Sequence, residues 1–202
     1  MPDEPITRKP QPEEAAEVAS LLYLTSPGGF ALFGGSPKGG MRVIEDAFSR
    51  SGTDNSREVV TVAELDGSLA GAMAAFPVNE AEERRRRFLL TALRHRAPWH
   101  WLHIWRLARH GSRHAPRPPA DAFYVDALAT ADGFRRRGVA MALLAEAERL
   151  ARESGLPALA LDTVATNTGA RALYTRFGFE VGEERPASPP IPALVGYVKR
   201  LA

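Results

Sequence analysis

The stretch FYVDALATADGFRRRGVA, residues 123–140, decides the fold of this chain because it joins two segments of different apolar period. Residues 123–129 are mostly apolar and predict a buried strand. Residues 139–152 predict an amphipathic helix, with Val139 and Leu143 on its buried stripe. A strand that passes through a short basic turn into a helix indicates a mixed α/β fold.

The basic turn between these segments, Arg135-Arg136-Arg137-Gly138-Val139-Ala140, is a candidate anion site. A first helical turn leaves backbone N–H groups unpaired, and the helix dipole places about half a positive charge there. Gly138 would let the backbone approach a ligand closely, and Ala140 keeps the next turn narrow. A pyrophosphate would fit this turn. The alternative is an ordinary helix start with solvated arginines.

The chain after residue 152 continues the alternation of strands and helices. The expected elements are a strand at 158–164, a helix at 168–176, and strands at 179–181 and 193–198. Asn167 is placed as the N-cap of the second helix, and Gly178 ends it. Tyr174 lies on the apolar face of this helix, so its phenol needs a polar partner.

The first part of the chain predicts one hairpin and two helices. The expected elements are strands at 4–8, 58–65 and 68–76 and helices at 12–24 and 41–51. Asp66-Gly67 between two apolar runs is a strong hairpin signal. The glycine-rich segment Ser26–Gly40 lacks the Lys-Ser or Lys-Thr pair of a phosphate-binding P-loop, and it predicts a mobile loop.

Residues 80–118 differ from the rest because all 5 histidines and all 3 tryptophans of the chain lie there. We interpret this segment as a helical insertion between the third and fourth strands of a single domain, residues 1–202. The run Arg84–Arg87 could bind nucleic acid. However, glutamates stand four residues before three of these arginines, the favourable order on a helix. A self-paired helix surface is therefore expected.

Composition excludes several classes of site. The length fits one domain, and the absence of cysteine excludes disulfides, thiolate metal sites and a cysteine nucleophile. Histidines at helical spacing lack carboxylate neighbours, so no metal site is expected. The N-terminus has no basic leader followed by an apolar run, and no segment approaches the ~18 apolar residues of a membrane span. We expect a soluble, cytoplasmic protein with no nucleic-acid or membrane partner.

Two motifs together resemble the GNAT superfamily of N-acetyltransferases. The family's cofactor motif is Arg or Gln, two residues, Gly, one residue, then Gly or Ala, and Arg135, Gly138 and Ala140 match it. The family's preceding Leu-Ala-Val resembles Leu128-Ala129-Thr130. Its second signature, Asn-x-x-Ala-x-x-Leu-Tyr followed by Gly-Phe, is matched by Asn167, Ala170, Leu173, Tyr174, Gly178 and Phe179. The two motifs stand in the family's order, within residues 121–182.

The resemblance implies a mixed, mostly antiparallel sheet flanked by helices, with acetyl-CoA as co-substrate. In that family the strand carrying Leu128 diverges from its neighbour, and the pantetheine arm pairs with the exposed backbone. The Leu128 N–H would then stabilise the oxyanion, a role worth ~3 kcal/mol. The pyrophosphate would bind the backbone of the basic turn, and Asn167 would brace the arm. The implied cofactor-binding residues are Leu128, Ala129, Thr130, Arg135, Arg136, Arg137, Gly138, Val139, Ala140, Asn167, Ala170 and Tyr174.

The resemblance also implies direct attack of a primary amine, from a small molecule or peptide, on the thioester. Such an amine has a pKa of ~10.4 and must lose a proton first. Asp126 is the first candidate base, two residues before Leu128 and hence expected on the same strand face. A cation-pairing role for Asp126 is the alternative, and Tyr124 could instead orient a water. Tyr174 resembles the family's general acid for the departing thiolate.

A non-catalytic acyl-CoA-binding domain is the alternative function. It would retain Arg135, Gly138 and Ala140 but could lose the acid and the base, and the presence of Tyr174 argues against it. The tryptophans of residues 80–118 would expose much aromatic surface on a monomer. We therefore expect this segment to cover the acceptor cleft or to pack against a second copy in a homodimer. A satellite core packed on its own domain is the alternative.

Overall fold

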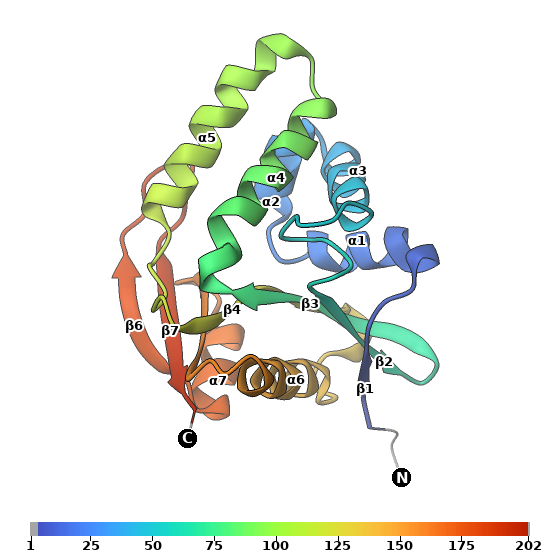
Figure 1. Ribbon diagram of the computed structural model, residues 1–202, viewed down its shortest axis with the longest axis vertical. Coiled ribbons are helices and arrows are strands. Elements are labelled where there is room, and N and C mark those ends of the chain that lie inside the picture. Colours follow the sequence, from blue (N-terminus) through green and yellow to red (C-terminus); the bar gives the residue numbers. More distant parts are fainter. Residues whose placement is uncertain (1–3, 202) are drawn as a thin grey trace.

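A computed structural model of the chain describes residues 4–201 and shows one sheet with helices on both faces (Figure 1). The strand order is β1-β2-β3-β4-β5-β7-β6; β4 and β5 are parallel, and the other neighbouring pairs are antiparallel. The strands are β1 (Ile6–Arg8), β2 (Val60–Leu65), β3 (Ser68–Pro77), β4 (Ala122–Thr130), β5 (Ala158–Val164), β6 (Glu180–Arg185) and β7 (Leu194–Arg200). The helices are α1 (Ala15–Tyr23), α2 (Pro27–Gly34), α3 (Pro37–Phe48), α4 (Ala81–Arg94), α5 (Trp101–His114), α6 (Val139–Glu153) and α7 (Thr168–Phe177). The predicted mixed, mostly antiparallel sheet is confirmed.

The helices form two layers because each buries one apolar stripe against the sheet. Leu22 of α1 and Phe48 of α3 pack on one face, in a core shared with β2 and β3. Val139, Leu143 and Ala147 of α6 are fully buried on the opposite face. The four-residue spacing of these three positions is the one that predicted the helix from the sequence.

The turn between β2 and β3 is a two-residue hairpin. Asp66 and Gly67 have φ angles of 53° and 70°. Two successive left-handed residues match the twist of the flanking strands, and this is the geometry that an Asp-Gly pair favours. The predicted hairpin is confirmed.

The expected mobile loop at Ser26–Gly40 is wrong, because most of this segment forms α2 and the start of α3. Glycine is a poor helix former, yet here it lets two helices meet backbone to backbone. A Cβ atom on Gly34 would lie 2.0 Å from the Gly40 nitrogen. Gly35, with a φ of 78°, turns the chain between the helices. Tertiary packing therefore overrides the local preference.

The segment predicted as a helical insertion folds as α4 and α5, between β3 and β4 in the chain. Figure 1 shows the two helices as a hairpin above the face of the sheet that α1 and α3 also cover. The Phe88 ring of α4 lies 6.0 Å from Phe30 of α2. At the other end, His110 Nε2 of α5 lies 3.1 Å from the carbonyl oxygen of Ser188, between β6 and β7. No helix within residues 4–201 is long and apolar enough to cross a membrane.

Candidate active site

Strands β4 and β5 begin as neighbours and then separate. Their parallel pairing runs from Ala122 opposite Ala158 to Val125 opposite Leu161. Beyond that point β4 continues through 126–130 beside β3, and β5 continues beside β7. The sheet therefore opens in a V whose inner edges are two unpaired strand ends.

The backbone amide of Leu128 points into this opening. Ala131, directly after β4, donates its N–H to the carbonyl oxygen of Ala70 at 2.9 Å, across the β3 side. Successive N–H groups of an extended strand point to opposite edges. The Ala129 N–H therefore points to β3, while those of Leu128 and Thr130 point towards β5. The donor that the family resemblance implied is available on the open side.

A β-bulge at Asp126 interrupts β4. Ala75 pairs with Val125 and Ala74 pairs with Ala127, so Asp126 is an extra residue opposite β3. Val125 and Leu128 pack on the α6 side, whereas Ala127 packs on the side of α1 and α3. The expectation that Asp126 shares a face with Leu128 is wrong, because the bulge breaks the alternation of side chains.

Asp126 instead shares the opposite face with Tyr124, beneath α4. The Tyr124 hydroxyl donates a short hydrogen bond to Oδ1 of Asp162 on β5. Arg85 of α4 places its guanidinium 5.6 Å from the centre of the Tyr124 ring. Its Nη2 lies 3.8 Å from Oδ1 of Asp126. Arg85 thus contacts both Tyr124 and Asp126, at the point where β4 and β5 separate.

Three carboxylates gather around that single arginine, and burial makes each harder to ionise. Burial raises the pKa of Asp162, an effect that the Tyr124 hydrogen bond and Arg85 oppose. Burial raises the pKa of Asp126, with Arg85 opposing and Asp162 adding to the increase. The pKa of Asp54, in the loop before β2, rises through burial and through the charge of Asp126. A site of this kind holds a proton at pH values where exposed carboxylates have lost theirs.

The basic turn adopts the conformation that an anion site needs. Arg136 and Gly138 have φ angles of 64° and 85°, and α6 begins at Val139. The first helical hydrogen bond runs from the Ala142 N–H to the Gly138 carbonyl at 3.0 Å. No described side chain caps this helix end, so its first N–H groups remain free for a ligand. Val139 is fully buried and can contribute only its backbone.

Two of the three arginines in the turn already have acidic partners. Arg135 Nη2 lies 2.7 Å from Oδ1 of Asp132, and Arg137 Nη2 lies 2.7 Å from Oδ2 of Asp66. All four side chains are at least 38% exposed, so these pairs are weak and a phosphate can compete for the cations. Arg136 makes no ion pair with any residue in the range 4–201.

Helix α7 brings the second predicted motif to the same edge of the sheet. α6 follows β4 and α7 follows β5, so both helices start at the carboxyl ends of the two parallel strands. Asn167 caps α7, and its Oδ1 accepts a hydrogen bond from the Ala170 N–H at 3.1 Å. The predicted cap is confirmed, and the Asn167 amide nitrogen makes no hydrogen bond to any residue in the range 4–201.

Tyr174 lies deeper, among aromatic neighbours on the α6 side. Its ring centre is 5.5 Å from that of Tyr197 and 5.9 Å from that of Phe179. The side chain is 6% exposed, and burial, with a smaller contribution from Asp162, raises its pKa above the usual range. Tyr174 is therefore protonated at neutral pH and carries a proton that it can donate.

Three residues near the opening escaped sequence reasoning: Asp54, Arg85 and Asp162. Arg85 is the one arginine of the run 84–87 with no glutamate four residues before it, whereas Arg84 and Arg87 pair with Glu80 and Glu83. Asp162 had a faint signal, since it follows four apolar residues on a buried strand. Asp54 had no local signal, because its burial comes entirely from the tertiary fold.

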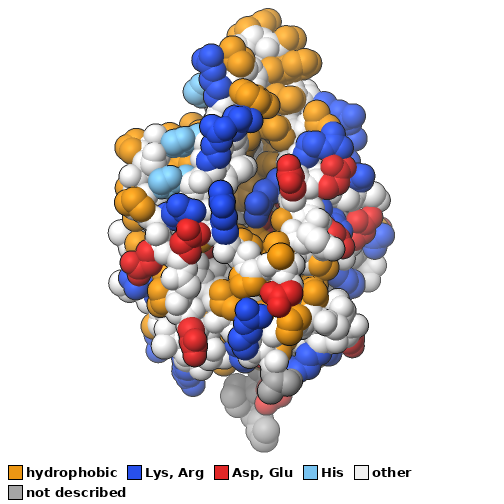
Figure 2. All heavy atoms as spheres, turned by 60° about the vertical axis from the view of Figure 1, so that its left-hand side comes forward, with side chains coloured by type: hydrophobic (Ala, Val, Ile, Leu, Met, Phe, Trp, Pro, Cys, Tyr) orange, Lys and Arg blue, Asp and Glu red, His pale blue; other side chains and the backbone are white. Residues whose placement is uncertain are grey.

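The face beneath the insertion is hollowed. Figure 2 shows a depression between the upper and lower parts of the molecule, with Lys and Arg side chains around it. A pocket reaches the Tyr124–Asp162 pair and has walls formed by Pro116, Arg117, Pro118, Leu161, Glu183, Gly196, Tyr197 and Val198. This small pocket lies beside the paired part of β4 and β5, and neither Asp126 nor Leu128 is among its walls.

Comparisons with known proteins agree with this geometry. The model of the acetyltransferase (GNAT) family matches residues 31–179. A solved structure described as an acetyltransferase superposes with a TM-score of 0.72 at 18% identity, over 98% of this chain and 100% of that chain. An N-acetyltransferase from Staphylococcus aureus Mu50 gives a TM-score of 0.71 at 18% identity, over 96% and 99%. No curated protein sequence matches the chain.

Proposed function

Because this chain belongs to the acetyltransferase (GNAT) family, we propose that it transfers the acetyl group of acetyl-CoA to a primary amine by direct attack. The observation that carries this proposal is the open edge of β4, where the Leu128 N–H faces the gap left by β5. A thioester held there would have its carbonyl oxygen beside a fixed donor. The acceptor is a small molecule or a peptide.

The cofactor would lie along this edge with its two ends held by different elements. The pantetheine arm would pair with the backbone of 128–130, and Asn167 and Ala170 at the start of α7 would flank it. The pyrophosphate would bind the free N–H groups of Arg136, Gly138 and Ala140, where the α6 dipole adds to the charge of the arginines. Arg135 and Arg137 would exchange their exposed carboxylate partners for phosphate oxygens.

The chemical step would form one C–N bond and break one C–S bond. The amine nitrogen attacks the thioester carbon, and the negative charge moves to the carbonyl oxygen. The Leu128 N–H stabilises that charge, a contribution of about 3 kcal/mol for one well-placed donor. When the tetrahedral intermediate collapses, the sulfur leaves with the electron pair of the C–S bond.

Three proton transfers accompany this step: the nitrogen loses one proton before attack and a second from the tetrahedral intermediate, and the leaving sulfur gains one. The acceptor ammonium loses its proton to Asp126, whose raised pKa makes it a better base than an exposed aspartate. Asp162, which accepts a hydrogen bond from the Tyr124 hydroxyl, would take the second nitrogen proton from the tetrahedral intermediate. Tyr174, kept protonated by burial, would donate to the departing thiolate.

The insertion would form the acceptor side of the site. α4 brings Arg85 over Tyr124 and within 3.8 Å of Asp126, so the polar group at the opening is completed by the hairpin. A non-catalytic acyl-CoA-binding domain would have no use for a proton-holding group at this place. This favours catalysis over sensing.

The test is turnover of acetyl-CoA against a panel of amines, with release of free CoA as the readout. Tyr174→Phe keeps the packed ring and removes the proton donor, so kcat should fall about 10²-fold while acetyl-CoA affinity stays nearly unchanged. Tyr197→Phe is the matched control. It removes a neighbouring hydroxyl that accepts from Arg171 at 3.1 Å, outside the proposed chemistry.

The results separate three roles. Equal loss of kcat in both variants would make Tyr174 a packing residue. Binding of acetyl-CoA without turnover of any amine class would support the sensing domain and contradict the proposal.

A further inference from the structure

The outer end of the α4–α5 hairpin exposes an apolar surface that the proposed reaction does not use. Figure 1 shows this hairpin rising away from the sheet, with its turn at the end of the molecule opposite the chain termini. Trp99 is 80% exposed, Leu102 56%, Leu90 48%, Trp105 47% and Trp101 45%. We refer to these five residues as the apolar tip. All five lie in the last part of α4, in the turn that follows it or in the first part of α5, and the Arg109 guanidinium lies 5.3 Å from the centre of the Trp105 ring.

The segment that carries the tip is rich in arginine and contains no acidic residue. Residues 84–120 contain 10 arginines and no aspartate or glutamate. Those near the base of α4 are paired, but no ion pair within residues 4–201 involves the arginines farther out. These are Arg94, Arg96, Arg106 and Arg109, here called the basic collar; Arg113 lies in the last turn of α5, at the end that contacts residues 186–188. Figure 2 shows apolar side chains at the outermost end, with Lys and Arg side chains below them.

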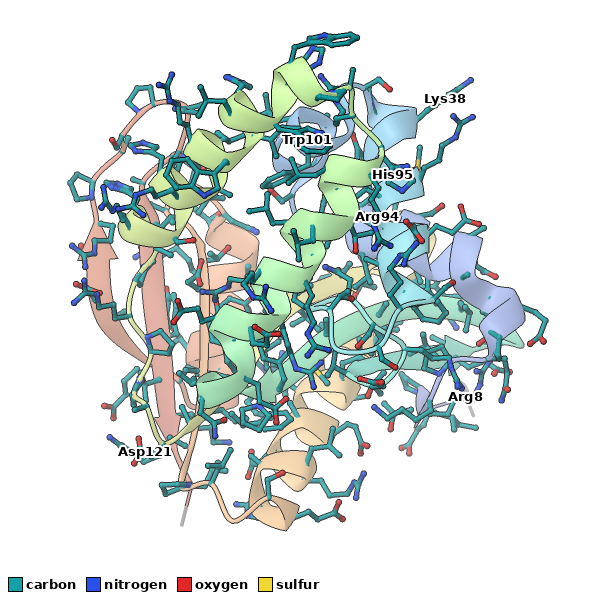
Figure 3. All side chains as sticks on the ribbon, turned by 45° about the horizontal axis from the view of Figure 1, so that its top comes forward. Arg8, Lys38, Arg94, His95, Trp101 and Asp121 are labelled. Carbon is teal, nitrogen blue, oxygen red and sulfur yellow. The ribbon has the colours of Figure 1, made fainter. Side chains whose placement is uncertain are left out.

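The tip is held in a defined shape. Trp101 Nε1 donates to the carbonyl oxygens of Leu93 and Arg96, at 3.0 Å each, which ties the start of α5 to the end of α4. His95 Nε2 lies 2.9 Å from Oδ2 of Asp46 on α3, which fixes the hairpin to the body. Figure 3 shows Trp101 near the top of the hairpin and His95 on the side towards α3. These contacts hold the apolar tip in a fixed position relative to the basic collar.

We propose that the apolar tip and basic collar dock the protein on the surface of an anionic phospholipid bilayer. Tryptophan and leucine at the outermost end suit the boundary between headgroups and acyl chains. Arginines just behind them lie at the level of lipid phosphates, where each contributes about 1 kcal/mol. The chemistry recognised is a sheet of phosphate anions over hydrocarbon.

Two other occupants fit less well. A second copy of the chain would bring its own unpaired arginines to the same contact, and like charges would repel. Nucleic acid would meet the arginines, but aliphatic Leu90 and Leu102 gain nothing from base stacking, and the aromatic rings stand beyond the cations. A phospholipid bilayer would contact both sets of residues, because its hydrocarbon suits the apolar tip and its phosphates suit the basic collar.

The experiment uses the intrinsic fluorescence of the full chain, because all 3 tryptophans lie within residues 99–105 and report only on the tip. The protein, without acetyl-CoA, is titrated with phosphatidylcholine vesicles and with vesicles containing about one third phosphatidylglycerol. Docking should shift the emission to the blue and sediment the protein with the anionic vesicles, at least tenfold more tightly than with neutral ones. Added salt should weaken the binding.

Matched variants separate the tip from the rest of the surface. Trp99→Ala with Leu102→Ser should weaken sedimentation at least tenfold, while Val181→Ser, a 52% exposed valine on β6, should not. Arg94→Gln and Arg106→Gln should each weaken it about fivefold, the factor for about 1 kcal/mol. Arg57→Gln, on an exposed arginine of the loop before β2, should not.

Several results would overturn the proposal. They are no blue shift with anionic vesicles, equal losses in the tip variants and their controls, tighter binding to RNA than to the vesicles, and a dimer that itself shields the tryptophans. None of these bears on acetyl transfer, which is measured separately without vesicles.

Discussion

At the scale of single residues, Gly138 shows how one backbone angle supports binding. Its φ of 85° lies in the left-handed region, and a Cβ atom there would meet only Pro5, at 4.0 Å. The left-handed conformation of the turn favours glycine at this position, and no atom within residues 4–201 crowds it. Close approach of a phosphate to this backbone stays a prediction.

We predict that Gly138→Ala weakens acetyl-CoA binding about tenfold in calorimetric titration. A non-glycine residue in the left-handed region costs roughly 1–2 kcal/mol, and a turn that relaxes to escape this strain must be restored for binding. Gly138→Glu should be more damaging, because its side chain and charge oppose the phosphates.

Two glycines serve as controls for this prediction. Gly133→Ala changes the same turn at a position with free space and no positive φ, so affinity should hold. Gly155→Ala introduces a similar strain, at a φ of 68°, beyond the end of α6. It should cost stability and spare affinity. Unchanged affinity in a folded Gly138→Glu variant would contradict the phosphate assignment.

Asp54 predicts a pH dependence of folding. Its pKa is raised in the folded chain, so between the unfolded value of ~3.9 and the folded value the native state holds the extra proton. The stability that this group contributes is present below the unfolded pKa and is lost as pH rises through the folded pKa. Asp54→Asn should therefore stabilise the protein at pH 8 by at least about 1 kcal/mol, the equivalent of one pKa unit.

Urea unfolding between pH 4 and pH 8 measures this effect. In the parent the unfolding free energy should fall as pH rises, and in Asp54→Asn it should fall less steeply. It should still fall, because the raised pKa values of Asp126 and Asp162 also lower stability as pH rises. Asp121→Asn, an exposed carboxylate beside Arg200, is the control. A parallel shift of the whole curve, with the slope unchanged, would contradict the assignment to Asp54.

At the scale of elements, the sequence predicted the features that depend only on neighbouring residues within one helix, strand or turn. The stripe of α6, the Asp-Gly hairpin and the Asn167 cap are local patterns, and they are confirmed. The glycine helices at α2 and α3 were missed because glycine indicates a loop unless a close partner is known. Asp126 was placed on the wrong face, since a bulge leaves no trace in an alternating pattern.

The contact between α2 and α3 gives a test within a single helix. Gly34→Ala would place a Cβ atom 2.0 Å from the Gly40 nitrogen, and separating the helices should cost about 1–3 kcal/mol of unfolding free energy. Gly28→Ala, in the same helix with nothing within 4 Å, should be neutral or stabilising by up to about 1 kcal/mol. Similar gains in stability in both variants would mean that helix propensity, and not the close contact of α2 with α3, governs this pair of helices.

At the scale of the whole molecule, the α4–α5 hairpin joins parts that the chain order keeps apart. It touches α2 through Phe88 and the β6–β7 connection through His110, and it brings Arg85 to Asp126. The sequence indicated a helical insertion at this place. It could not indicate that Arg85 leaves the self-paired run to meet residues about forty positions away, because that contact exists only after folding.

Replacing residues 80–118 with a short Gly-Ser linker should abolish acceptor turnover and preserve acetyl-CoA binding. In the proposed arrangement the hairpin covers the acceptor side, whereas α6 and α7 pack on the other face of the sheet. Calorimetry and steady-state kinetics on the folded variant measure the two effects, and its mass in solution tests the homodimer alternative. Parent kinetics and parent mass would mean that the segment has neither role.

A milder variant covers the case in which the replacement does not fold. Arg85→Gln leaves the hairpin in place and removes the charge beside Asp126. It should lower kcat/KM for the amine and displace its pH profile, without altering acetyl-CoA affinity. An unchanged pH profile would mean that Arg85 does not influence the protonation of Asp126.

Asp126 is supernumerary to the sheet. If it were absent from the chain, Val125 and Ala127 would become consecutive, still opposite Ala75 and Ala74, and already on alternate faces. Every other residue of β4 would keep its partner and its side of the sheet. The strand β4 is thus complete without Asp126, and pairing with β3 does not explain why the residue is present.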